Sequence, residues 1–342
     1  MDRGSHGRKP VTMKDIAERV GVSINTVCHA LRDENDISEE TKQIIRRTAD
    51  EMGYIRNASA SSLRSGVTKT VALILGSISN PYFSIMAQDA ENFWFEKGYT
   101  MMIFNTNEDP ALERKAIETA VGKNADGILI SPAPGGEDNI RFLKRLHKPF
   151  VLVGRHFPEK GIAACSVRRD DAQGGYLLAQ HLLSLGHRKI AFLHGPLSIS
   201  SSTERLSGYL RALREADMPI RPELIYEVPV TMEKNQGVLR SIFSNRPDCT
   251  AVIAFNDMIA WEIISLLNRA GLRVPDDLSI VGFDNIQAQF TFPAPLTSVS
   301  SERSLGLAAA EALLARIRRP ASEPIEEILS VKLTVRESTR PL

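Results

Sequence analysis

From residue 70 onward, the chain alternates short apolar runs with amphipathic segments of helical period. The apolar runs lie at residues 70–75, 99–104, 126–130, 150–153, 189–193, 224–228, 251–255 and 278–283. Continuous apolar runs of this length are typical of strands buried on both faces of a parallel sheet, and the helices between them supply the cover. Two series of four runs therefore predict an α/β core of two similar, doubly wound subdomains with a cleft between them.

The helices predicted between these runs complete a core at residues 70–342. They are expected at roughly 82–97, 109–123, 137–146, 172–186, 203–216, 233–244 and 257–271. A further helix at 302–318 and a strand near 328–336 would return to complete both subdomains. The first subdomain is then expected at about 70–169 and 301–330, and the second at about 170–300 and 331–342.

Residues 11–56 carry the start and stop signals of three helices. Side chains that accept hydrogen bonds at a helix N-terminus precede each helix, and they are Thr12, Ser23 and Ser38. Gly21 and Gly53 stand where the first and third helices would end, because glycine readily adopts the positive φ of that position. These signals predict a small all-α head at the N-terminus.

The spacing of Ala17, Gly21 and Val27 predicts that the first two helices form a helix-turn-helix. A small residue is needed where the second helix crosses the first, glycine makes the turn, and Val27 packs the two helices together. The second helix would then present four side chains to a DNA major groove: Ile24, Asn25, Cys28 and His29. The alternative is an ordinary helical hairpin with solvated polar faces.

Cys28 and His29 are adjacent, and such a pair could be a nucleophile with its base, half a metal site or part of a DNA-reading surface. Neighbours on a helix point about 100° apart, so these two side chains do not converge on one site. No third residue for a triad or metal shell is adjacent in sequence, and no phosphate-binding fingerprint follows a strand. The DNA-reading interpretation is favoured, and we predict no catalytic residue, metal site, cofactor or enzyme activity.

Charge gives no independent support for DNA binding. The formal net charge is +1, and residues 1–66 hold 11 Lys and Arg against 10 Asp and Glu. Specific binding then needs local arrangement, with Arg8, Lys9, Lys14 and Arg19 facing the phosphates and with Asp33, Glu34 and Asp36 facing away. Three widely spaced cysteines, no signal-peptide pattern and no apolar run of about 18 residues favour a cytoplasmic protein without a membrane anchor.

Two polar segments flank the head. Residues 1–10 are rich in glycine and basic residues, which predicts a disordered arm. Residues 57–69 are dominated by small polar side chains and read as a flexible linker. Ala58, Ala60, Leu63 and Arg64 could instead make one short helix, which would need a partner to fold.

A collinear series of motifs resembles the lac/galactose repressor family of transcription regulators. The motifs are V-T-M-K-D-I-A-E-R-V-G-V-S-I-N-T-V (11–27), G-Y-I-R-N (53–57), A-S-S-L-R (60–64), N-P-Y-F (80–83), G-H-R-K-I-A-F-L-H-G-P (186–196), R-L-S-G-Y (205–209), A-F-N-D (254–257), G-L-R-V-P-D-D-L-S-I-V-G-F-D-N (271–285) and P-L-T-S-V (295–299). The resemblance implies a helix-turn-helix head, a hinge helix and a core of the periplasmic sugar-binding fold. It also implies a homodimer on operator DNA, controlled by a small-molecule effector in the cleft.

The resemblance implies a set of DNA-contacting residues. They are Thr12, Ser23, Ile24, Asn25, Thr26, Cys28, His29, Tyr54, Asn57, Ala60, Leu63 and Arg64. Ile24, Asn25 and His29 match base-reading positions, where asparagine can pair with adenine and histidine can donate to guanine. Leu63 matches a hinge leucine that wedges into the minor groove and kinks the duplex. Tyr54 matches a tyrosine that packs near the DNA backbone. Four residues match phosphate-contacting positions, which fix the register, and they are Thr12, Ser23, Thr26 and Asn57.

The chain departs from the family pattern at three places in this surface. Cys28–His29 stands where the family commonly has Ser-Arg, Arg56 where the hinge often has Pro, and Ser61 where it often has Arg. Histidine is shorter than arginine and near-neutral at pH 7. We therefore expect an operator preference that differs from the family's and that depends on pH.

The effector is expected in the cleft, at the carboxyl ends of the parallel strands. The predicted effector-binding residues are Tyr82, Phe83, Arg155, Arg205, Met232, Asn256 and Asp284. An arginine with an aspartate suits vicinal hydroxyls, because arginine donates twice and a carboxylate accepts twice. A sugar or sugar derivative is favoured over a purine-type co-repressor.

Several of these residues also have structural interpretations. Arg205 and Asp284 could form an ion pair with each other, and Tyr82 and Phe83 could only line the cleft. Asp257 is favoured as a helix N-cap rather than a ligand contact. Asp170 could cap a helix or contact the ligand. Taken together, the sequence predicts a DNA-binding regulator, most often a repressor, controlled by an effector in the core.

Overall fold

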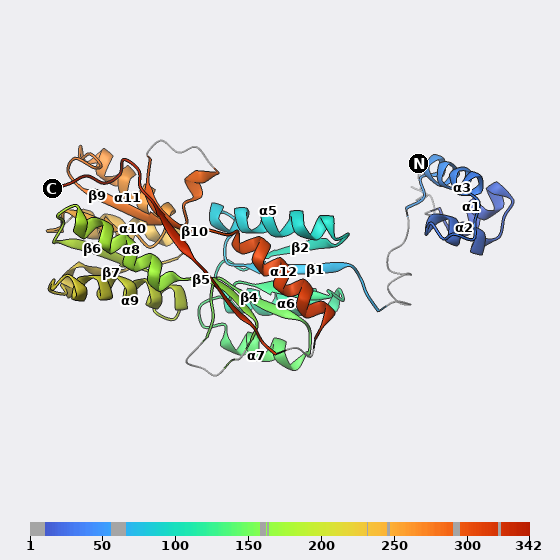
Figure 1. Cartoon of the computed structure of the whole chain (residues 1–342), viewed down its shortest axis with the longest axis horizontal. Coiled ribbons are helices and arrows are strands. Elements are labelled where there is room, and N and C mark those ends of the chain that lie inside the picture. Colours follow the sequence, from blue (N-terminus) through green and yellow to red (C-terminus); the bar gives the residue numbers. More distant parts are fainter. Residues whose placement is uncertain are drawn as a thin grey trace, which may run out of the picture. The chain divides into compact units, whose positions relative to one another are not determined.

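The computed structural model describes residues 11–55, 66–157, 162, 164–230, 232–244, 247–289, 295–320 and 323–342, without the side chains of 232–234. The chain divides into two compact units, the head (Met1–Thr68) and the core (Lys69–Leu342) (Figure 1). Some predicted features lie outside the described residues: the arm at 1–10, Arg56, Asn57, Ala60, Ser61, Leu63 and Arg64, and the side chain of Met232.

The head contains the three predicted helices, α1 (Met13–Val20), α2 (Ile24–Leu31) and α3 (Glu39–Met52). The predicted N-caps are confirmed, because the side chains of Thr12, Ser23 and Ser38 each accept a hydrogen bond from a backbone N–H of the first turn. Gly21 and Gly53 end α1 and α3 with φ of 77° and 69°, as the sequence predicts. Ala17 and Val27 are buried where α1 and α2 meet, which confirms the helix-turn-helix.

The first subdomain of the core is built on a six-stranded parallel sheet of order β11-β5-β4-β3-β1-β2. Its strands are β1 (Thr70–Leu75), β2 (Thr100–Asn105), β3 (Gly127–Ile130), β4 (Phe150–Val153), β5 (Ser166–Arg169) and β11 (Glu326–Leu329). Its helices are α5 (Pro81–Glu96), α6 (Pro110–Gly122), α7 (Glu137–Arg145) and α12 (Leu305–Arg318).

The second subdomain is built on a sheet of order β12-β10-β9-β8-β6-β7, parallel except for β12 against β10. Its strands are β6 (Ile190–His194), β7 (Ile225–Glu227), β8 (Ala251–Ile253), β9 (Ser279–Phe283), β10 (Thr297–Ser301) and β12 (Val331–Thr334). Its helices are α8 (Asp171–Ser184), α9 (Ser200–Glu215), α10 (Met232–Ser244) and α11 (Asp257–Arg269), with short 3-10 turns η2 (Pro222–Leu224) and η3 (Ile286–Ala288).

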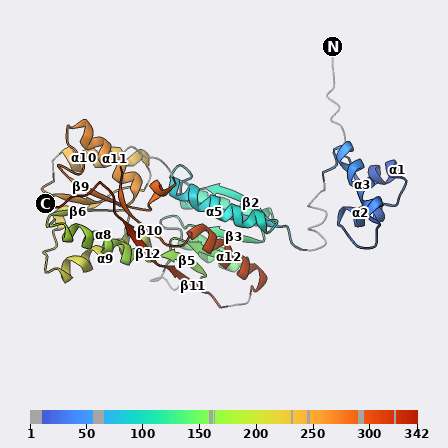
Figure 2. The ribbon, with the colours of Figure 1, turned by 45° about the horizontal axis from the view of Figure 1, so that its top comes forward.

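Both sheets are covered on two faces, as the continuous apolar runs predict. In β1, Val71 and Leu73 pack toward α5 and α12, whereas Ala72 and Ile74 pack toward α6 and α7. Helices α5 and α12 lie side by side in both views (Figures 1 and 2). The second sheet is covered by α8 and α9 on one face and by α10 and α11 on the other.

The C-terminal tail departs from the prediction of one strand near 328–336. It forms two strands, because β11 pairs parallel with β5 in the first sheet and β12 pairs antiparallel with β10 in the second. Only Ser330 lies between these two strands, so this crossing from one subdomain to the other is a single residue long. Strands β5 and β10 were not among the predicted runs, because their sequences S-V-R-R and T-S-V-S-S are largely polar.

Within the described residues, every helix is too short or too polar to serve as a membrane span.

Candidate DNA-reading helix and effector pocket

Helix α2 has one face toward the head core and one toward solvent. Val27 and Ala30 are buried, whereas Ile24 is 48% exposed and Asn25 is also exposed. A single exposed isoleucine is normal on a protein surface, so this exposure shows only that the face of α2 is accessible. Cys28 lies half-buried on the same helix and is a free thiol.

The other predicted DNA contacts of the head lie at helix ends. Thr12 and Ser23 cap α1 and α2, where backbone N–H groups suit an incoming phosphate. The hydroxyls of Ser23 and Thr26 lie 2.9 Å apart. Tyr54 is half-buried against the head core just after α3. These positions are compatible with phosphate contacts, although Tyr54 also packs on the head core and Thr12 and Ser23 also cap helices.

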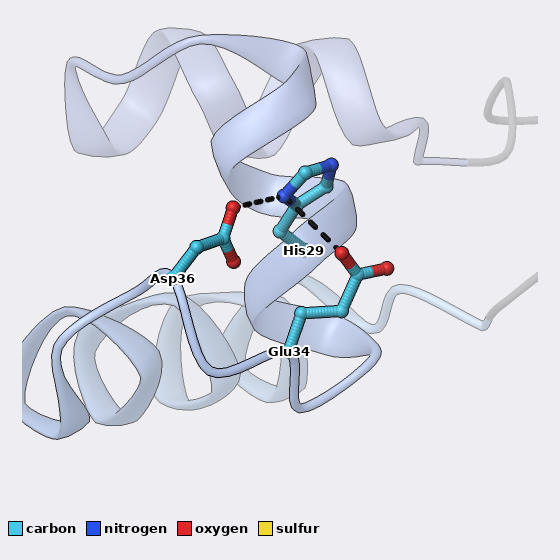
Figure 3. A group of neighbouring side chains, drawn as sticks. All are labelled: His29, Glu34 and Asp36. Atoms are coloured by element: carbon cyan, nitrogen blue, oxygen red, sulfur yellow. Dashed lines mark hydrogen bonds and ion pairs between the residues drawn. The ribbon is translucent and has the colours of Figure 1, made fainter.

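Two acidic side chains, Glu34 and Asp36, lie beside His29, a contact that the sequence does not predict. Its Nδ1 lies 2.5 Å from the carboxylate of Asp36 and 3.3 Å from that of Glu34 (Figure 3). The expectation that these two carboxylates face away from the phosphates stays a prediction, but both lie beside the imidazole and not free in solvent. The cause is the turn after α2: Asp33 adopts φ of 64°, and the backbone N–H of Glu34 donates to the carbonyl of His29.

These carboxylates change the charge expected at His29. The hydrogen bond with Asp36 raises the pKa of His29 above its ordinary value, and the charge of Glu34 acts in the same direction. Burial and the nearby Arg32 oppose this shift. The expectation of a near-neutral imidazole at pH 7 is thus corrected toward a larger charged fraction.

The core contains a pocket at the carboxyl ends of the strands of both sheets. Its lining comes from residues that follow β1, β2, β3 and β4 in the first subdomain and β8 and β9 in the second. The pocket brings together all the predicted effector residues whose side chains are described: Tyr82, Phe83, Arg155, Arg205, Asn256 and Asp284. This is the place where open α/β sheets bind small molecules.

Two of the pocket's arginines are already engaged by carboxylates. Arg155 donates from Nη1 and Nη2 to the two carboxylate oxygens of Glu108, at 2.6 and 3.0 Å. Arg205 donates from Nε to Asp171 at 2.8 Å and from Nη1 to the carbonyl of Phe255 at 2.6 Å. The ion pair of Arg205 with Asp284, left open by the sequence, is therefore not the one that forms.

Asp284 pairs instead with Arg169, which the sequence analysis did not select. Arg169 Nη1 donates to Asp284 Oδ1 at 2.9 Å, and this ion pair joins the end of β5 in one subdomain to the end of β9 in the other. The Arg169 guanidinium lies 4.7 Å from the ring centre of Tyr82 and 4.8 Å from that of Phe283. A guanidinium between two rings is stabilised by cation–π attraction.

Asp284 also has an unusual backbone. Its φ is 115°, a conformation that residues with a side chain rarely adopt and that is typically retained at functional sites. Burial raises the pKa of the Asp284 carboxyl, and the charge of Arg169 opposes this shift. The strain and the burial together mark this carboxylate as a candidate ligand contact.

Asp170 and Asp257, both considered as helix caps from sequence, have different roles. Asp170 caps α8, since its carboxylate accepts from the backbone N–H of Gln173 at 2.8 Å. The N-cap of α11 is Asn256 and not Asp257, which corrects the expectation from sequence. Asp257 instead accepts from Ile286 N and Ser298 Oγ, and burial raises its pKa to about 8. Asp257 thus ties together the segments beneath the pocket.

Three lining residues retain polar atoms without a hydrogen-bond partner among the described residues. They are Nε of Arg169, Oδ1 of Asn235 and Oε2 of Glu262. Such atoms are rare in folded proteins, because each one loses its bond to water without replacement. Five other such atoms belong to described residues outside the lining, so the three in the pocket are groups open to a ligand or to water.

Two family models match the chain. Residues 12–57 match the model described as bacterial regulatory proteins of the lacI family, and residues 68–337 match periplasmic binding proteins and the sugar-binding domain of the LacI family. The chain belongs to the lacI family. The predicted resemblance is therefore confirmed, as is the fold of a helix-turn-helix head with two parallel-sheet subdomains.

Relatives of this lacI-family chain include transcriptional regulators of known name. It is 34% identical to the regulator DegA of Bacillus subtilis, over 97% of this chain and 98% of the relative. It is 30% identical to the transcriptional repressor PurR of Actinobacillus pleuropneumoniae serotype 3, over 97% of this chain and 99% of the relative.

Solved structures of regulators share this fold. A CelR–cellobiose complex matches with TM-score 0.68 and 26% identity, covering 96% of this chain and 99% of that one. A lac repressor dimer bound to operator and an anti-inducer matches in fold with TM-score 0.84 and 23% identity, covering 97% and 100%.

Proposed function

We propose that this lacI-family regulator is a homodimeric, cytoplasmic repressor that binds operator DNA and is controlled by a neutral, hydroxyl-rich effector in the core pocket. Its activity is binding alone, without catalysis. The observation that carries the effector class is the charge state of the pocket. Each described arginine of the lining is paired with a carboxylate, so no cation is left for an anionic ligand.

The unpartnered atoms point to the same class. Asn235 and Glu262 offer free acceptors and Arg169 a free donor, a set that alcohol groups satisfy because each hydroxyl both donates and accepts. A phosphate or carboxylate would instead be repelled by the unpaired oxygen of Glu262. Tyr82 and Phe83 lie edge to face with ring centres 5.1 Å apart and give the pocket an apolar wall.

A thermal-shift screen of the full chain tests this proposal. Neutral sugars should raise the unfolding temperature, because a ligand that binds only the folded state stabilises it by mass action. Sugar phosphates and uronic acids should be weaker than their neutral counterparts. A purine-type co-repressor is the alternative that the sequence leaves open. A purine hit with no sugar hit would reject the sugar assignment while leaving the DNA-binding role intact.

The proposed DNA surface joins the exposed face of α2 to the hinge segment. Leu63 lies outside the described residues, and its role as a minor-groove wedge rests on the family resemblance. We expect Leu63→Ala to weaken specific operator binding far more than non-specific binding, because only the kinked specific complex needs the wedge. Fluorescence anisotropy on operator and on random duplex measures both.

The control for Leu63→Ala is Leu112→Ala, the same truncation on the exposed side of α6. It should change neither binding constant. Equal losses on the two DNAs for Leu63→Ala would remove the wedge from the proposal.

The proposed coupling runs through the two subdomains. An effector that contacts both sides of the pocket binds one relative orientation of the subdomains more tightly than another. Only such a difference in effector affinity can shift the population from one orientation to the other. The Arg169–Asp284 pair already joins the two subdomains, as does the pair of Arg168 with Glu204, so both contacts are expected to respond to such a change.

A further inference from the structure

The two nitrogens of the His29 ring have different surroundings. Nδ1 faces the carboxylates of Asp36 and Glu34, and one polar atom from each of the three side chains lies within 4.8 Å of the others. Among the described residues, Nε2 has no hydrogen-bond partner, and Figure 3 shows it turned away from both carboxylates. The ring is thus held from one side and open on the other.

The carboxylate contact determines where the ring hydrogen lies. His29 lowers the pKa of Asp36 through their hydrogen bond, so Asp36 is ionised near neutral pH. An ionised carboxylate can only accept, so Nδ1 must carry a hydrogen in both charge states of the ring. It follows that Nε2 alone changes with pH: it is a bare acceptor in the neutral ring and an N–H donor in the charged ring.

We infer that Asp36 makes His29 a pH-dependent reader of one base pair in the operator. The charged ring donates from Nε2 and selects an acceptor in the major groove, best supplied by guanine O6 or N7. The neutral ring accepts at Nε2 and selects a donor, adenine N6 or cytosine N4. This inference rests on the proposed DNA-reading role of α2 and assigns Asp36 as a positioning residue.

Two ion pairs tie the turn that carries Asp36 to α3. The carboxylate of Asp33 lies 3.1 Å from Lys42 Nζ and 2.7 Å from Arg46 Nη2. The Asp33 side chain is 66% exposed, so both pairs are open to water and each contributes little to stability. Together with the contact of Asp36 with His29, they connect α2, the turn and α3.

The charged groups around the ring set the direction of the effect. Asp36 and Glu34 favour the charged ring, Arg32 opposes it, and Lys42 of α3 acts on Asp36. The pKa of free His29 is raised, and a bond from Nε2–H to guanine raises it further in the complex. Guanine preference is therefore fully present below the pKa of the free protein and is lost as pH rises through the pKa of the complex.

The test is selection of operators from a random duplex pool by the full chain at about pH 6 and about pH 8.5, on either side of the ordinary histidine range. Chelator is included so that trace metal cannot compete for the ring. We expect wild type to select guanine at one symmetric position at the lower pH. That preference should fall by about tenfold at the higher pH, the loss of one charge-assisted contact.

Asp36→Asn, compared with a matched control, tests whether Asp36 sets the pH dependence. Asp36→Asn removes the charge but keeps an acceptor, so guanine preference should be lost at a lower pH than in wild type. Asp50→Asn is the matched control, the same change at an exposed carboxylate of α3, and its pH profile should match wild type. A profile for Asp36→Asn that coincides with wild type would overturn the role of Asp36.

His29→Ala distinguishes failure of the inference from failure of the DNA-reading role. If His29→Ala changes the selected base but wild type shows no pH dependence, the ring reads DNA and the inference is wrong. If His29→Ala and wild type select the same bases at every position and both pH values, His29 does not read DNA. The DNA-reading role of His29 and the inference about Asp36 are then both wrong. Selection of no sequence at all would contradict operator binding itself.

Discussion

Asp284→Asn is expected to lower effector affinity by about 10- to 100-fold, the equivalent of one or two hydrogen bonds to a charged group. The carboxylate is buried at the pocket wall and held by Arg169, and an amide offers one acceptor oxygen in place of two. Operator binding without effector should survive, because the substitution changes no side chain of the DNA-binding head. Calorimetry with the best neutral sugar of the screen, and anisotropy with operator, measure the two constants.

Asp276→Asn is the matched control for this substitution, since Asp276 lies in an exposed turn outside the pocket. It should leave both constants unchanged. Retained effector affinity in Asp284→Asn would remove Asp284 from the binding site. If operator binding is lost as well and circular dichroism shows an unfolded core, Asn235→Ala carries the test, because Asn235 lines the pocket and its Oδ1 has no partner among the described residues.

Gly208→Ala is expected to destabilise the second subdomain by about 2–3 kcal/mol or more, the usual cost of overpacking a tight contact. A Cβ on Gly208 of α9 would lie 1.9 Å from the carbonyl oxygen of Ala172 in α8. A Cβ on Gly175 of α8 would lie 2.1 Å from the carbonyl of Arg205 in α9. The backbones of α8 and α9 are therefore in direct contact, next to Arg205 of the pocket lining.

Urea unfolding followed by circular dichroism measures this prediction, with Gly237→Ala as the control. Gly237 lies within α10 with nothing within 4 Å of its would-be Cβ, so alanine there should stabilise by about 0.5–1 kcal/mol through helix propensity. Equal effects of the two substitutions would contradict the close approach of α8 and α9.

The elements that the sequence predicted well are those with local signals. Thr12, Ser23 and Ser38 cap their helices through hydrogen bonds within the first turn, so no distant residue is needed to predict them. Apolar strands were equally visible because both of their faces are buried. Strands β5 and β10 were missed because they are largely polar, and only the assembled sheet shows what their polar side chains contact.

The site residues also differ in how far they could be predicted from the sequence. The family resemblance placed Arg205 and Asp284 near each other, but it could not assign their partners, which come from Asp171 and Arg169. The neighbours of His29 were also out of reach. Glu34 and Asp36 look like solvated charges in sequence, and the left-handed turn at Asp33 brings them to the ring.

The most direct test of the account is the operator affinity of the full chain with and without the best neutral sugar of the screen. Anisotropy titrations at fixed salt on a selected operator give both constants. We predict a change of about 5- to 150-fold in wild type, the usual range of allosteric coupling, and little change in Asp284→Asn. An operator affinity that is the same with the pocket saturated and with the pocket empty would contradict effector control.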